Sequence, residues 1–235
     1  MKATKTRLLW VLGLAALGCG IMALVDGLWQ PGYVIKSAIK LAVFGLLPII
    51  GARIWGLIPM KELFRFRKKG FLIALGLGLG IYALILGAYF LIGGFFDFSK
   101  VAGNLTSNAG VTKENFLFVS LYISFVNSLL EEFFFRGFVF RNMKRLSKGW
   151  IAYGSSAVLF AAYHIAMMLG WFGFGLNALI LLGLTVGGLI FNWLNEKLSC
   201  IYASWLTHMF ANFAINTIGF LLLNQEVSCP ITMIG

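Results

Sequence analysis

The sequence contains seven long stretches of predominantly apolar residues, and this feature constrains the fold most strongly. A helix needs about 20 such residues to cross the hydrocarbon core of a bilayer. The stretches are Leu8–Leu28, Ala42–Pro59, Phe71–Phe96, Phe116–Phe140, Ile151–Phe172, Phe174–Leu194 and Ile201–Leu223. They leave too little of the chain for a soluble domain. We therefore predict an all-α fold, a polytopic transmembrane helix bundle with residues 1–235 in a single integral membrane domain.

The composition supports this class of protein and excludes two others. Of the 235 residues, 60% are hydrophobic and only 11% are charged, whereas soluble domains carry roughly 25% charged residues. A disordered chain is excluded because 23 Phe, 7 Trp and 7 Tyr present a large apolar surface. The net charge is +11, but no basic run belongs to a soluble recognition module. We expect the lipid bilayer as a partner and no nucleic acid.

The basic residues predict how the chain is oriented in the cell membrane. One set of alternate loops contains Lys2, Lys5, Arg7, Lys61, Arg65, Arg67, Lys68, Lys69, Arg141, Lys144, Arg145, Lys148 and Lys197. The opposite side has at most Lys36, Lys40, Lys100 and Lys113. Because cytoplasmic loops carry an excess of Lys and Arg, we predict a cytoplasmic N-terminus.

Two spans contain glycine pairs with a spacing of four residues, Gly76/Gly80 and Gly183/Gly187. This spacing places two small residues on one helix face, where a neighbouring backbone can approach closely. The spacing therefore permits close helix packing at both pairs.

A few polar side chains lie inside the predicted spans, where they are costly and mark functional sites by default. They are Glu131, Glu132 and Arg136 in the fourth span, His164 in the fifth, and His208 and Asn212 in the seventh. With a helical rise of about 1.5 Å per residue, Glu131, His164, His208 and Asn212 lie roughly 15, 21, 14 and 20 Å from the cytoplasmic edge. We expect the four side chains to converge.

The helical period separates the charged residues of the fourth span into two roles. Glu132 and Arg136 lie about 40° apart on the helix, which favours a structural ion pair. Glu131 points about 140° away from Arg136 and is left for chemistry. A buried carboxylate with a neighbouring imidazole can activate a water, and amide and imidazole N–H groups can stabilise an oxyanion. The set is typical of acyl-bond hydrolysis, whereas single members would be explained as hydrogen bonds between helices.

Three motifs on successive spans carry a resemblance to a known family. Glu131-Glu132-Phe133-Phe134-Phe135-Arg136 reads as EExxxR, Phe160 to His164 as FxxxH, and His208 to Asn212 as HxxxN. The region from about 116 to 220 resembles the protease core of the CPBP intramembrane proteases. That family includes CAAX prenyl endopeptidases and proteins linked to bacteriocin processing, self-immunity and abortive infection.

The resemblance implies a peptidase site inside the membrane that opens to the cytoplasmic side. Glu131 would activate water with help from His164, and His208 with Asn212 would stabilise the oxyanion. Glu132 and Arg136 would support the geometry. We expect no cofactor, although Glu131, His164 and His208 also permit a zinc site; the HExxH motif is absent.

The substrate implied is a membrane-associated or lipidated, CAAX-like peptide or protein, and the sequence leaves its prenylation and the oligomeric state open. Two alternatives remain. One is a non-catalytic membrane scaffold or bacteriocin self-immunity protein that retains the protease fold. The other is a transporter or channel with a carboxylate proton relay, although the chain has no visible inverted repeat.

Overall fold

The computed structural model describes residues 2–57, 64, 66–107 and 110–225, and every regular element within these ranges is a helix. Seven helical segments are long and apolar enough to cross a membrane, which confirms the predicted class. They are Thr4–Trp29, Tyr33–Ile54, Gly70–Phe95, Phe116–Leu146, Gly149–Met168, Phe174–Leu198 and Ile201–Asn224.

Several spans consist of consecutive α-helical segments and shorter 3-10 or π-helical segments, here labelled η. The elements that build the bundle are α1 (Lys2–Leu24), η1 (Val25–Trp29), α2 (Tyr33–Lys40), η2 (Leu41–Leu46), α3 (Leu47–Ile54), α4 (Lys68–Ile92), α5 (Ser99–Ser107), α6 (Phe116–Tyr122), η5 (Ile123–Asn127), α7 (Ser128–Glu131), η6 (Glu132–Phe140), α8 (Arg141–Leu146), α9 (Gly149–Ile165), α10 (Phe174–Leu198) and α11 (Ile201–Gln225).

The second span begins nine residues earlier than the sequence predicts, at Tyr33 instead of Ala42. The prediction was wrong because it treated Lys36 and Lys40 as loop residues. Both lysines lie on α2 and pair with acidic residues of other elements, so their charges are compatible with an apolar bundle. The predicted end of this span at Pro59, and the basic residues Lys61 and Arg65, lie outside the described residues.

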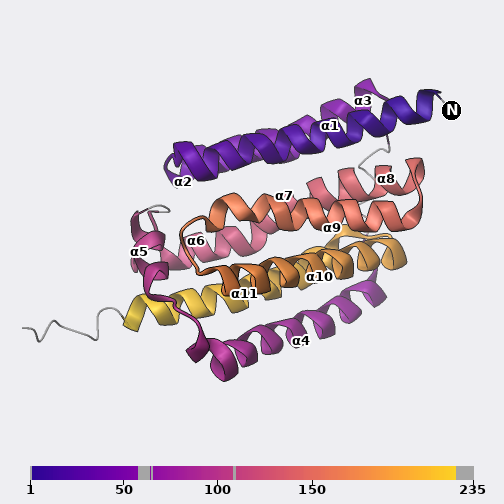
Figure 1. The fold of residues 1–235 in the computed structure, drawn as a ribbon. Coiled ribbons are helices and arrows are strands. Elements are labelled where there is room, and N and C mark those ends of the chain that lie inside the picture. Colours follow the sequence, from indigo (N-terminus) through magenta and orange to yellow (C-terminus); the bar gives the residue numbers. More distant parts are fainter. Residues whose placement is uncertain (1, 58–63, 65, 108–109, 226–235) are drawn as a thin grey trace, which may run out of the picture.

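The helices form a layered bundle with the fourth span, α6 to α8, in its interior (Figure 1). The helices α1 to α3 lie along one edge, and α4 lies along the opposite edge. Helix α4 packs against α11, α9 packs against α10, and α1 packs against α8 and α9. The fourth span is therefore enclosed by the N-terminal helices on one side and by α9 and α11 on the other.

An aromatic core joins the N-terminal helices to the fourth span. Phe44 of η2 stacks on Phe134 of η6 with 4.2 Å between ring centroids, and it meets Phe135 and Tyr163 edge-on at 5.6 and 5.2 Å. Phe44, Phe134 and Phe135 are completely buried. This packing fixes the position of η2 relative to η6, next to Glu131 and Glu132.

The outer surface is apolar, as lipid contact requires. Leu84, Phe90, Leu91 and Phe174 are exposed by 70, 70, 81 and 90%. In water such side chains would form a large unfavourable patch, whereas hydrocarbon solvates them.

Two glycines other than the predicted pairs allow close helix packing. A Cβ atom at Gly78 of α4 would lie 2.5 Å from the Phe210 ring of α11, and one at Gly188 of α10 would lie 3.0 Å from Cα of Ala157 on α9. At Gly76, Gly80, Gly183 and Gly187 a Cβ atom would meet no described atom within 4 Å. The two pairs therefore lie away from the described helix contacts, since spacing identifies a shared face but not the face that meets a neighbour.

The fourth span has widened π-helical turns at η5 and η6, and its backbone carbonyls there accept hydrogen bonds from neighbouring helices. Asn212 Nδ2 donates to the Ile123 carbonyl at 3.2 Å, and Trp205 Nε1 donates to that of Phe125 at 2.9 Å. Ser156 Oγ of α9 donates to the Phe135 carbonyl at 3.1 Å. The span is thus held to α9 and α11 by directional contacts next to the predicted site.

Candidate active site

The structure brings Glu131, His164 and His208 together from three helices. Nε2 of His164 on α9 lies 3.9 Å from Oε2 of Glu131, and Nε2 of His208 on α11 lies 3.7 Å from the same oxygen. The Glu131 side chain is 2% exposed. Residues 33 and 77 positions apart along the chain therefore meet at one carboxylate oxygen inside the bundle, as their estimated depths predict.

Hydrogen bonds at the other ring nitrogens determine what the two imidazoles present to Glu131. Nδ1 of His164 lies 2.7 Å from the Phe160 carbonyl, and Nδ1 of His208 lies 3.0 Å from Oε1 of Glu132. A carbonyl or carboxylate oxygen accepts, so we assign the proton of each neutral ring to Nδ1. Both Nε2 atoms then direct a lone pair towards the space beside Glu131.

The gaps between these Nε2 atoms and Glu131 suit a bridging water. At 3.7 and 3.9 Å they exceed the range of a direct hydrogen bond. Polar groups separated by more than about 3.5 Å interact through a bridging water where one lies between them. A water placed between them would donate one hydrogen to the carboxylate and the other to an imidazole, which is the geometry needed for its deprotonation.

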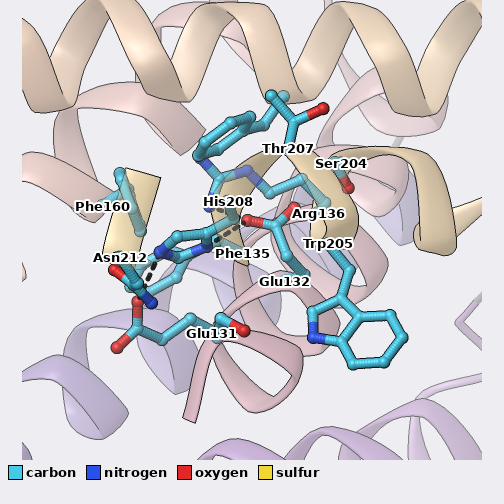
Figure 2. Close-up of polar contacts among 12 residues, drawn as sticks. Glu131, Glu132, Phe135, Arg136, Phe160, Ser204, Trp205, Thr207, His208 and Asn212 are labelled. Carbon is cyan, nitrogen blue, oxygen red and sulfur yellow. Dashed lines mark hydrogen bonds and ion pairs between the residues drawn. The ribbon is translucent and has the colours of Figure 1, made fainter. Parts of the chain in front are cut away.

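Glu132 and Arg136 form the ion pair that the helical period predicts. Nη1 of Arg136 lies 3.1 Å from Oε1 of Glu132, and both side chains are completely buried. The guanidinium also lies over the rings of Phe160 and Phe191, at 4.1 and 4.9 Å from their centroids. Because Glu132 also accepts from His208, one oxygen links the buried cation to the imidazole (Figure 2).

Asn212 lies one turn after His208 on α11 and belongs to the same polar face. Its Nδ2 donates to the Ile123 carbonyl at 3.2 Å. An amide nitrogen has two N–H groups, so this contact orients the side chain and leaves a second donor. The side chain is partly buried, consistent with a position at the edge of the site.

Lys40 is a residue of the site that sequence reasoning missed. Its Nζ lies 2.6 Å from Oε1 of Glu131, and the residue is 4% exposed. Asn127, one turn before Glu131, contacts both: its Oδ1 accepts from Lys40 and its Nδ2 donates to Oε1 of Glu131 at 2.9 Å. A buried carboxylate needs a counter-charge, and that requirement was the available signal.

The zinc alternative involves the same three side chains, Glu131, His164 and His208. Within the described ranges, no group of three or more His, Cys, Asp or Glu side chains is placed so that it could hold a metal ion. In addition, the ammonium group of Lys40 is in contact with the carboxylate that would serve as a ligand. A cation bound there would meet electrostatic repulsion from Lys40.

Comparison with known families places these residues in context. Residues 113–214 match the family described as Type II CAAX prenyl endopeptidase Rce1-like. These residues form a CPBP family domain. The matched family is a protease family, and such a family implies a protein or peptide substrate. No curated protein and no solved structure matches the chain.

The CPBP domain contains all three motifs and ends just after Asn212. It therefore includes Glu131, Glu132, Arg136, His164, His208 and Asn212. Lys40 lies in the N-terminal helices, outside the matched residues.

Proposed function

We propose that this protein is an intramembrane endopeptidase that hydrolyses a peptide bond of a membrane-associated or lipidated, CAAX-like substrate with a water activated by Glu131. The observation that carries the proposal is the convergence of two Nε2 atoms on Oε2 of Glu131, at 3.7 and 3.9 Å. A carboxylate and two imidazoles around one position are the parts that water activation requires.

In the proposed reaction, Oε2 of Glu131 takes a proton from the water while the water oxygen attacks the carbonyl carbon of the substrate. His164 accepts the second water hydrogen through Nε2 and so orients the nucleophile, since its Nδ1 is engaged by the Phe160 carbonyl. The tetrahedral intermediate then collapses, the C–N bond breaks, and Glu131 returns its proton to the departing amine. Water is consumed and a carboxylic acid and an amine are formed.

Asn212 and His208 are the proposed donors to the oxyanion. Asn212 has a second amide N–H and needs no change of protonation to donate. His208 already donates through Nδ1 to Glu132, so its Nε2 donates only when both ring nitrogens carry protons. We therefore assign the oxyanion first to Asn212, with His208 joining it in the protonated form.

Glu132 and Arg136 are proposed to support the site without touching substrate. Their ion pair holds His208 through Glu132 and packs Arg136 against the rings of Phe160 and Phe191. We further propose that the seven spans form one domain and that the site opens to the cytoplasmic side, which the distribution of basic loops favours.

The test uses the full chain reconstituted in vesicles. The substrate is a fluorogenic peptide with a farnesylated cysteine three residues from a free C-terminus, compared with the same peptide without the lipid. We expect cleavage by the wild-type protein and a loss of about 10²–10⁴-fold in kcat for Glu131→Gln, the range for a positioned acid–base group. Glu196→Gln is the matched control, because Glu196 lies on α10 and pairs with Lys144.

Cleavage of both peptides would support a membrane peptidase that does not require the lipid. Unchanged cleavage by the Glu131→Gln variant would contradict the mechanism. If the wild-type protein cleaves neither peptide nor a library of membrane-anchored peptides, the non-catalytic scaffold or immunity role would be favoured instead.

A further inference from the structure

Lys40 is a buried cation in the middle of the bundle, and its contacts are all directed towards the site. Its Nζ donates to Glu131 Oε1 at 2.6 Å and to Asn127 Oδ1. The ammonium also lies 5.0 Å from the ring centroid of Tyr163 and 5.5 Å from that of Phe44. Two hydrogen-bond acceptors and two aromatic faces account for a charge that the apolar surroundings would otherwise exclude.

These contacts divide the Glu131 carboxylate into two functionally different oxygens. Oε1 is held by Lys40 at 2.6 Å and by Asn127 Nδ2 at 2.9 Å. Oε2 faces Nε2 of His164 and of His208 across the longer gaps that suit a water. The carboxylate cannot rotate without losing two charge-assisted hydrogen bonds, so Oε2 remains the oxygen that faces the imidazoles.

The charges of the buried site balance only when Lys40 is included. Glu132 is neutralised by Arg136, and Glu131 is in contact with Lys40. The other buried acid of the described residues, Asp26, has its own partner in Lys36 at 2.8 Å. Without Lys40, Glu131 would be a buried carboxylate with no cation of its own, a state that such groups avoid by taking up a proton.

We propose that Lys40 is a positioning residue for Glu131. It keeps the carboxylate ionised and oriented so that Oε2, and not Oε1, accepts the proton from the water. This inference rests on the proposed function. It assigns the N-terminal helices a direct part in the site, because Lys40 lies outside residues 113–214 that match the CPBP family. The CPBP domain would then need α2 for a competent base.

Lys40→Met tests the proposal, since methionine fills a similar volume without the charge. With the lipidated peptide and the full chain in vesicles, we expect kcat to fall about 100-fold, the effect of a misplaced reacting group, while KM stays the same. Lys36→Met is the matched control, because Lys36 lies one turn earlier on α2 and pairs with a buried acid away from Glu131. It should keep the wild-type kcat even if it lowers stability.

Wild-type kcat in Lys40→Met, or an equal loss in Lys36→Met, would overturn the proposal. Infrared spectroscopy provides a readout that needs no substrate. Lys40→Met should show a protonated carboxyl band that disappears in the Lys40→Met/Glu131→Gln double variant, and a missing band would also overturn it. If the wild-type protein cleaves no peptide, the proposed function is contradicted. The infrared spectrum still tests whether Lys40 keeps Glu131 ionised, because it needs no substrate.

If Lys40→Met alone does not fold, the double variant keeps the proposal testable. Removing both charges together leaves no unpaired charge, so the double variant should be recovered as folded protein where Lys40→Met is not. A double variant no more stable than the single one would show that Lys40 is not the counter-charge that Glu131 requires, and would overturn the proposal.

Discussion

Oε1 of Glu132 lies 3.0 Å from Nδ1 of His208, so a carboxylate outside the proposed reaction orients the ring that takes part in it. The same oxygen is the partner of Arg136 at 3.1 Å. The two adjacent glutamates therefore differ in their surroundings: Glu132 contacts a permanent cation and an N–H donor, whereas one oxygen of Glu131 faces Nε2 of two imidazoles.

Glu132→Gln should destabilise the protein strongly while preserving its shape. The amide oxygen can still accept from His208, but the completely buried Arg136 loses its counter-charge. Removing one partner of a buried ion pair costs about 3–5 kcal/mol. Thermal unfolding in detergent measures the change. Glu196→Gln, whose side chain is 33% exposed, should cost about 1 kcal/mol or less. Equal stability of the two variants would contradict the importance of the buried pair.

His208→Asn should separate folding from activity. The asparagine amide can donate to Glu132 as Nδ1 of His208 does, but it has no group in the place of Nε2. We expect near wild-type unfolding temperature and a fall of about 10²–10³-fold in kcat on the lipidated peptide, the range for loss of one oxyanion donor. Asn216→Ala, two turns further along α11, is the control and should keep kcat, since Asn216 contacts Ser120 and Ser124. Full activity in His208→Asn would remove His208 from the mechanism.

Gly78→Ala and Gly188→Ala should each lower stability, because the added methyl group would meet Phe210 at 2.5 Å or Ala157 at 3.0 Å. Overpacking of this kind costs about 1–3 kcal/mol. The neighbours Gly76 and Gly187 are matched controls, with no described atom within 4 Å of the added carbon. Alanine there should be neutral or stabilising by about 0.5–1 kcal/mol. The reverse order in thermal unfolding would mean that α4 and α10 are rotated from the positions described.

Peptidase activity should persist after treatment with EDTA and phenanthroline. The physical reason is the ammonium of Lys40, 2.6 Å from the carboxylate that a metal would need as a ligand. The measurement is kcat on the lipidated peptide before and after chelation, with the Glu131→Gln variant defining the background. Loss of activity that zinc restores would contradict this prediction and favour the site at Glu131, His164 and His208.

Much of the fold could be predicted because membrane insertion is governed by local composition. Six of the seven spans begin within four residues of the expected positions, since about 20 consecutive apolar residues form a spanning helix with little reference to the rest of the chain. The meeting of Glu131, His164 and His208 was also predictable, because the rise per residue places them at comparable depths.

The contacts of individual faces could not be predicted in the same way. Gly76 and Gly80 share a helix face, but only the rotation of α4 in the bundle determines that Gly78 is the residue against Phe210. Likewise, the π-helical turns of the fourth span expose the Ile123 carbonyl to Asn212, a contact that a regular helical period does not anticipate.

The sequence by itself determined the membrane class, six of the seven span starts and the identity of the motif residues, because each depends on a short segment and its spacing. Tertiary structure decided which groups surround Glu131. Its counter-charge, Lys40, comes from 91 residues earlier in the chain, on a helical segment that the sequence-based prediction left outside the second span. A buried charge is stable only beside its partner, and that partner is defined by packing in space instead of by position along the chain.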